Sequence, residues 1–202
     1  MELDGFVIDI RRGDLLIEIQ TSAFAAMGRK LDRVLSEYQV LIVHPIAVQT
    51  YLHRPEVKPR RSPKRGDIYD LFDELVSIPT LLDHPNLAIE VILATVDKHQ
   101  RPDPTLRRRR GGWRTHDRCL REITSRHRFD TIADLETLVP AGLPTVFTTA
   151  DLASAAGITR AQAQKMAFCL RELEIFTLME RTRQGFQYCV GPRASGRSRG
   201  PN

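Results

Sequence analysis

The sequence lacks any apolar run near the ~20 residues that a membrane-spanning helix requires. It also lacks a start typical of a signal peptide, so a cytoplasmic protein is expected. The few cysteines (Cys119, Cys169 and Cys189) form no CxxC pair, which favours reduced thiols over a disulfide framework or a zinc site. No P-loop, GxGxxG, HExxH or GxSxG motif occurs, and this argues against nucleotide, zinc-protease and serine-hydrolase chemistry.

Basic residues, by contrast, are concentrated in a few segments. The 202 residues are 42% hydrophobic and 27% charged, which suits one large or two small globular domains, and the net charge is +5. Residues 53–65 carry a net +5 and residues 101–128 a net +7. Prolines in 53–65 and 101–114 predict that both segments are basic loops. The tail, residues 191–202, is rich in Gly, Ser, Arg and Pro and is predicted to be a disordered basic tail.

Hydrophobic periodicity in the first 138 residues predicts a mixed α/β fold. Apolar residues at helical spacing predict a helix over Ala23–Glu37. The apolar run Gln39–Ile46 predicts a strand covered on both faces and ended by Pro45. The other expected elements are a β-hairpin over residues 4–20, a helix over 67–76, a strand or buried helix over 87–96, a strand over 113–128 and a short helix over 130–138.

The C-terminal segment carries clear helix boundaries. Thr148 and Thr149 can cap a helix that Gly157 ends, and the sequence Thr159 to Gln162 matches a capping box that opens a second helix to about Glu174. Two strands, 175–180 and 186–190, follow. This order resembles a winged helix-turn-helix, and a small helical cap with the same periodicity is the alternative. We therefore divide the chain into a domain over 1–128, a winged-helix-like domain over 129–190 and the tail.

Two carboxylates are expected to meet on one face of the N-terminal hairpin. If Ile10 lies opposite Leu15, alternation gives one wholly apolar face and places Asp9 diagonally beside Glu18, with Gln20 two residues along. Like charges at this separation are costly unless a cation neutralises them. Mg²⁺ prefers such hard oxygen ligands and could activate a water for attack on a phosphate. An Asp/Glu pair on a solvated strand surface is the plainer alternative.

The segment LDGFVIDIRRGDLLIEIQTSAF, followed by an amphipathic helix and QVLIVHP, resembles the core of the PD-(D/E)XK nuclease superfamily. The resemblance implies a restriction-endonuclease-like mixed sheet in which Asp9 and Glu18 bind Mg²⁺ or Mn²⁺. Gln20 would stand at the position of the superfamily's lysine. Lys30, on the following helix, would supply the positive charge that Gln20 lacks. His44 is read as a structural histidine and Lys30, taken alone, as an ordinary surface lysine.

Further cations are candidates for gripping phosphates, with Trp113 stacking on a base or on an arginine. A solubilising charged surface is the alternative for the same residues. The candidate nucleic-acid-binding residues are Arg60, Arg61, Lys64, Arg65, Arg107, Arg108, Arg109, Arg110, Trp113, Arg114, Arg160 and Lys165.

The leading interpretation is metal-dependent hydrolysis of DNA phosphodiesters, carried by Asp9, Glu18, Gln20 and Lys30. One alternative is a non-catalytic DNA-binding or regulatory protein with a degenerate nuclease core. Another is a protein-interaction adaptor. RNA is an alternative substrate, a homodimer is allowed, and no membrane partner is expected.

Overall fold

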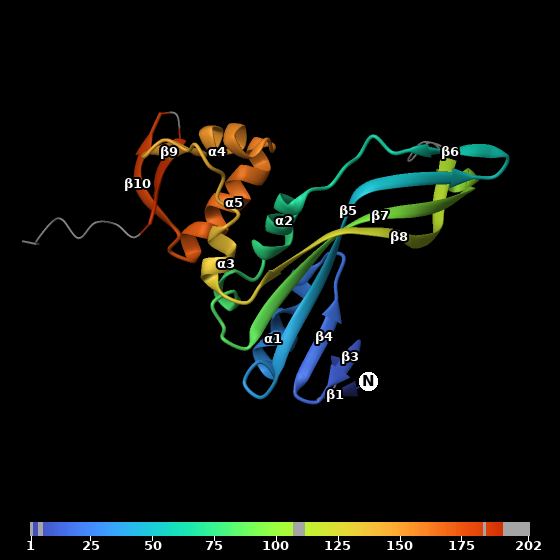
Figure 1. Cartoon of the computed structure of the whole chain (residues 1–202), viewed down its shortest axis with the longest axis horizontal. Coiled ribbons are helices and arrows are strands. Elements are labelled where there is room, and N and C mark those ends of the chain that lie inside the picture. The colour runs from blue at the N-terminus through green and yellow to red at the C-terminus, as the bar shows by residue number, and fades with distance from the viewer. Residues whose placement is uncertain (1, 4–5, 107–111, 184, 192–202) are drawn as a thin grey trace, which may run out of the picture.

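A six-stranded mixed sheet organises the molecule. The computed structural model describes residues 2–3, 6–106, 112–183 and 185–191. Figure 1 shows the sheet's lower part beside α1, an arm of long strands extending away from it, and a C-terminal unit on the other side. The strand order is β3-β4-β5-β7-β8, with β6 also paired to β5. The strands are β3 (Ile10–Arg12), β4 (Leu15–Ile19), β5 (Gln39–Arg54), β6 (Val57–Arg61), β7 (Leu87–Pro102) and β8 (Trp113–Phe129).

The N-terminal hairpin forms in a register different from the one expected. Ile10 lies opposite Ile17 rather than Leu15, because the turn contains only Gly13 and Asp14. Gly13 has φ +60°, a left-handed conformation that glycine adopts without steric cost. The connecting loop is even in length, as predicted, but the chain bends at Asp9. The predicted uninterrupted strand to residue 4 is therefore wrong, and a separate pair, β1 (Glu2–Leu3) and β2 (Phe6–Val7), precedes the bend.

The bend also changes which side chains share a face. Ile8 is buried among core residues, whereas Ile10 is 40% exposed, so the two isoleucines do not form one continuous apolar surface. Leu16 and Glu18, two residues apart on β4, are both buried. The wholly apolar face predicted from alternation is thus wrong, because alternation holds only while the strand continues.

Parallel pairing of β4, β5 and β7 is reached through helical crossovers. η1 (Phe24–Met27) and α1 (Gly28–Val34) connect β4 to β5, in agreement with the predicted helix. η2 (Ile68–Asp70), α2 (Leu71–Leu75) and η3 (Pro79–Leu81) lie between β6 and β7, and this confirms the helix predicted over 67–76. The segment 87–96, left open between strand and helix, is a strand. β8 then returns antiparallel to β7, which confirms the strand predicted over 113–128.

β5 continues through Pro45 instead of ending there. Pairing of β4 with β5 stops at Val43, and pairing of β6 with β5 involves Tyr51 to Arg54. Pro45 lies between these segments, where β5 pairs with β7 alone. A proline is tolerated at such a position because its missing N–H is not needed by a neighbouring strand.

The first segment predicted as a basic loop, 53–65, is mostly strand, because the end of β5 and β6 form a hairpin across residues 53–61. In the second segment, 101–114, the described residues are strand only at the ends of β7 and β8, and residues Pro104–Leu106 between them form η4. In the β5–β6 hairpin, Pro55 occupies the turn, and Pro59 lies on β6, which has a strand partner on one side only. The loop prediction for 53–65 is wrong because prolines at turns and sheet edges do not prevent strand pairing. We refer to the paired segments 49–61, 95–102 and 113–121 as the arm.

The C-terminal unit agrees closely with the expected element order. Its helices are α3 (Ile132–Glu136), α4 (Thr149–Ala156) and α5 (Arg160–Glu172), and its strands are β9 (Phe147–Thr148), β10 (Phe176–Thr182) and β11 (Gly185–Val190). The hydroxyls of Thr148 and Thr159 accept N-terminal N–H groups in capping boxes, and Gly157 ends α4 in a left-handed conformation. One continuous cluster of buried residues joins β4, α1, α2, α4, α5 and β10. The predicted tail lies outside the described residues, except for Gly191.

Candidate functional site

A charged pair is buried between β4 and α1. Glu18 is 3% exposed, and its Oε1 atom lies 2.6 Å from Nζ of Lys30. Lys30 also donates a hydrogen bond to the carbonyl oxygen of Val7. The prediction that Lys30 lies on the helix packed against this strand is confirmed, and its ammonium reaches the carboxylate.

Asp9 and Gln20 lie near this pair in the chain but make different contacts. Asp9 is exposed, and its Oδ2 atom accepts a hydrogen bond of 2.8 Å from the backbone N–H of Ile19. The backbone carbonyl of Gln20 accepts a 2.6 Å hydrogen bond from Nδ1 of His44. His44 is 3% exposed and packs edge-on against Phe24. These contacts support a structural role for His44.

The buried pair does not fit a divalent ion as it stands. Glu18 is committed to Lys30, so binding an ion through both Asp9 and Glu18 would require that this ion pair break. Throughout the part of the chain that the structure describes, no buried side-chain nitrogen or oxygen lacks a hydrogen-bond partner. Nor do three His, Cys, Asp or Glu side chains converge within those residues to hold a metal.

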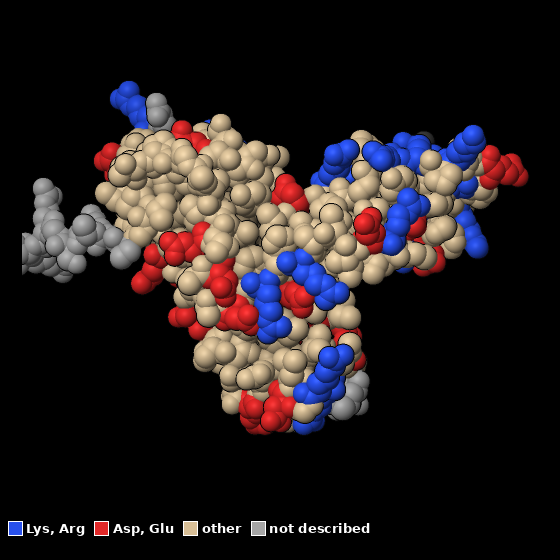
Figure 2. Space-filling model, in the orientation of Figure 1, with Lys and Arg blue, Asp and Glu red and all other residues tan. Residues whose placement is uncertain are grey.

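Basic side chains cross one face of the arm in a row. Arg60 pairs with Leu52, Leu52 with Lys98, and Lys98 with Arg118. Directly paired residues on neighbouring strands project to the same side of a sheet. The row therefore contains three cations and Leu52, and Figure 2 shows Lys and Arg side chains gathered over the arm.

The same face continues toward the tip of the arm with polar and aromatic groups. Gln100 pairs with Thr115, and Pro102 pairs with Trp113. Arg54 stacks over the Trp113 ring at 4.2 Å and donates a 3.1 Å hydrogen bond from Nε to Oε1 of Gln100. Of the two stacking partners expected for Trp113, the structure shows the arginine. We refer to this side of the arm as the groove face.

The opposite face of the arm is largely neutralised by its own contacts. Arg121 bonds to both carboxylate oxygens of Asp97, at 2.8 and 3.0 Å, and His53 Nε2 donates to Oδ1 at 2.5 Å. Partial burial opposes ionisation, but these hydrogen bonds outweigh it and hold the pKa of Asp97 below its ordinary value. Arg121 also stacks on Tyr51 at 3.9 Å, and Arg61 donates to the Tyr51 hydroxyl. Less charge on this face is therefore available to a ligand.

Other predicted nucleic-acid-binding residues lie in three different settings. Lys64 and Arg65 are exposed just after β6. Arg114 is paired with Asp103, and hydrogen bonds from Thr105 and Arg114 lower the pKa of that carboxyl to about 2. The four predicted loop cations, Arg107, Arg108, Arg109 and Arg110, lie outside the described residues.

The two cations predicted on α5 are separated from the arm. Lys165 forms a 3.0 Å ion pair with Asp73 of α2, and Gln162, one turn earlier, donates a 2.7 Å hydrogen bond to Asp70. Arg160 is exposed at the start of α5. This side of α5 therefore faces α2 rather than open solvent.

Sequence reasoning missed Lys98, Arg118, Arg54 and Gln100 on the groove face. Alternation in β7 could have indicated two of them, because Lys98 and Gln100 alternate with Asp97 and His99 and therefore share one face of the strand. It was missed because the strand was expected to end at residue 96. Residues 97–100 were assigned to no element and residues 53–65 to a loop, so no direction of their side chains was inferred.

The chain belongs to the family described as a domain of unknown function (DUF8091), which it matches over residues 1–130. It is also similar to an uncharacterized protein of Treponema pallidum (strain Nichols), with 29% identity over 159 residues. That similarity covers 76% of this chain and 63% of the relative, so the chain spans less than two thirds of the relative's length. No solved structure matches the chain. The buried pair and the arm both lie within the family segment, whereas α5 lies outside it.

Within the described residues, no helix has the length and apolar character needed to cross a membrane.

Proposed function

We propose that this protein binds the phosphate backbone of nucleic acid along the groove face of the arm. The observation that carries the proposal is the row of Arg60, Lys98 and Arg118 across three strands. Lys98 and Arg118 are direct cross-strand partners, so their positive charges lie on the same side of the arm. Phosphates are suited to such a row of cations, and contacts to them position a protein on nucleic acid without reading its sequence.

The proposal is tested by removing the row and comparing a matched control. In one variant Arg60, Lys98 and Arg118 are each replaced by Gln. In the control, the exposed arginines Arg12, Arg29 and Arg183, which lie away from the arm, are replaced by Gln, so that net charge falls equally. Binding is measured by the anisotropy of a labelled oligonucleotide.

We expect the arm variant to bind at least about tenfold more weakly than the native chain, while the control changes little. The slope of log affinity against log salt should fall by about 2 on a single strand, since each lost phosphate contact contributes roughly 0.7. Equal weakening in both variants would show that only net charge matters, and it would contradict a binding face on the arm.

A second candidate function is metal-dependent hydrolysis of nucleic acid at the Glu18–Lys30 pair. One observation favours it: a hairpin, a helix and a parallel strand surround this pair, and the helix supplies the lysine. This order is the one expected for a PD-(D/E)XK-like core. This candidate includes the proposal that the mixed sheet is a restriction-endonuclease-like core. It also includes the proposal that Glu18 would bind Mg²⁺ or Mn²⁺ once its ion pair with Lys30 breaks.

This candidate predicts cleavage of duplex, single-stranded or branched DNA, or of RNA, that requires Mg²⁺ or Mn²⁺. Glu18→Gln should abolish the cleavage and Asp9→Asn should reduce it strongly. The control variant with Gln at Arg12, Arg29 and Arg183 should cleave as the native chain does. Cleavage that survives Glu18→Gln in a folded variant would contradict the mechanism. Binding without any cleavage would favour the alternative of a non-catalytic DNA-binding or regulatory protein with a degenerate nuclease core.

For the C-terminal unit we propose a winged-helix-like fold that serves as an attachment module. The order α4, tight turn, α5 and hairpin β10–β11 supports this fold. Because Gln162 and Lys165 bond to α2, we infer that α5 joins the unit to the N-terminal sheet rather than entering a groove of DNA. A cytoplasmic location stays a prediction.

A further inference from the structure

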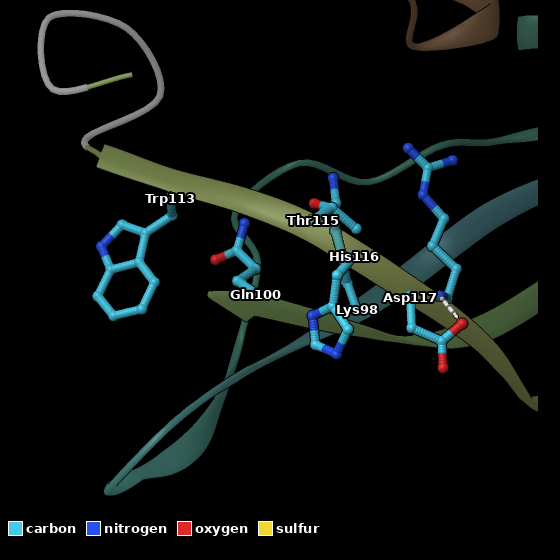
Figure 3. A pocket seen from close by; sticks show the side chains of 7 residues that line it. Lys98, Gln100, Trp113, Thr115, His116 and Asp117 are labelled. Atoms are coloured by element: carbon cyan, nitrogen blue, oxygen red, sulfur yellow. Dashed lines mark hydrogen bonds between the residues drawn. The ribbon is translucent and has the colours of Figure 1, made fainter. Parts of the chain in front are cut away.

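A groove on the arm lies beside the cation row. Its volume is about 650 Å³, and its lining includes Lys98, Gln100, Trp113, Thr115, His116 and Arg118. Figure 3 shows the Trp113 indole and the His116 ring on β8, with the Gln100 amide of the neighbouring β7 between them in this view. Asp117 also lines the groove, and its carboxylate accepts a 2.7 Å hydrogen bond from the backbone N–H of Arg118.

Trp113 provides a supported aromatic surface in this groove. The Arg54 guanidinium covers one side of the ring at 4.2 Å and is itself held by Gln100. An indole fixed in this way loses little freedom when a flat ligand stacks on it. Aromatic side chains on positively charged strands are a common platform for unpaired bases, because every base presents a π-face.

Polar groups next to Trp113 suit the edge of a base. Gln100 and Thr115 are cross-strand partners two pairs away from Pro102 and Trp113, and therefore lie on the same face. An amide and a hydroxyl together offer both donors and acceptors. Lys98 and Arg118 follow on the same face, at the point where neighbouring phosphates would need cations.

We propose that the groove binds an unpaired base of single-stranded nucleic acid, stacked on Trp113, with adjacent phosphates on Lys98 and Arg118. The inference rests on the proposed function, since it names the form of nucleic acid that the groove face prefers. A duplex keeps its bases stacked inside, so it can contact the cations but not the Trp113 ring. The arm therefore prefers single strands to duplexes.

Trp113 is the one tryptophan of the chain, so its fluorescence reports on the groove directly. The probes are a short oligothymidine, the matching oligouridine and a DNA duplex of the same length, each titrated into the full chain. We expect quenching by a single strand and none by the duplex. Tighter binding of oligouridine would assign RNA as the ligand, and tighter binding of oligothymidine would assign DNA.

Substitutions separate the contribution of stacking on Trp113 to binding affinity from the contribution of the cations. Trp113→Leu should weaken single-strand binding about tenfold and leave duplex binding unchanged, while Trp113→Phe should retain most of the affinity. Binding is followed by anisotropy of the labelled strand, and urea unfolding confirms that both variants are folded. Gln100→Ala is a second variant, and it should weaken single-strand binding by a smaller factor.

Two outcomes would overturn the inference, and they are distinguishable. Equal affinity for duplex and single strand, without quenching and without an effect of Trp113→Leu, would exclude the base pocket but leave phosphate binding intact. Absence of binding to every probe at low salt would remove the proposed function as well.

Discussion

Replacement of Lys30 by Met is expected to lower the free energy of unfolding by about 3–5 kcal/mol. The substitution keeps most of the side-chain volume but leaves Glu18 buried without its cation. Breaking a buried ion pair by removing one partner is costly because the remaining charge is uncompensated. The Lys30 and Glu18 side chains are only 13% and 4% exposed, so solvent cannot take over the missing partner's role. Urea unfolding of the native and variant chains measures the effect.

Two comparisons identify the cause of that loss. Adding Glu18→Gln to Lys30→Met should recover a large part of the stability, because a neutral amide is cheaper to bury than a carboxylate. Lys165→Met removes a lysine from the half-exposed pair with Asp73 and should cost only about 0–1 kcal/mol. A cost below about 1 kcal/mol for Lys30→Met would show that the pair contributes little to the fold, against our expectation.

Affinity for single-stranded nucleic acid is expected to fall about a hundredfold when salt rises from about 50 to 200 mM. Five cations on the groove face of the arm and at its margin can contact phosphates together, and each contact releases condensed counterions. These cations are Arg60, Lys64, Arg65, Lys98 and Arg118. The measurement is a series of anisotropy titrations on one oligonucleotide at increasing salt.

A shallow salt dependence would contradict a binding mode based on phosphate contacts. Uncharged sucrose at matched osmolality is the control, since it leaves counterion release unchanged. The slope of log affinity against log salt also shows which face of the arm contacts phosphates. Arg121→Gln, on the face where Asp97 already holds the guanidinium, should change the slope less than Arg118→Gln.

Local features of the sequence predicted local structure well. The caps at Thr148 and Thr159 and the stop at Gly157 were correct, because each depends on hydrogen bonds or backbone angles within a few residues. The apolar stripe of the first helix was also correct, and it placed Lys30 beside the sheet.

Predictions that depended on neighbouring strands were less successful. The hairpin register was wrong by two residues, because the turn contains only Gly13 and Asp14 and the strand is interrupted at Asp9. The prolines in 53–65 suggested loops, although Pro55 lies in a turn and Pro59 on a strand edge. A sequence cannot show which N–H groups lack a partner until the sheet order is known.

The sequence by itself determined a mixed α/β chain, a helix that brings a lysine against an acidic strand, and basic charge concentrated in two segments. The tertiary structure alone decided that residues 53–61 form a β-hairpin, and that Arg60, Lys98 and Arg118 share one face. It also decided that Glu18 is paired with Lys30 and that Lys165 faces α2. The physical reason is that charge and hydrophobic periodicity can be read along the chain. The direction of a side chain, its ion-pair partner and its burial depend instead on which distant residues become neighbours.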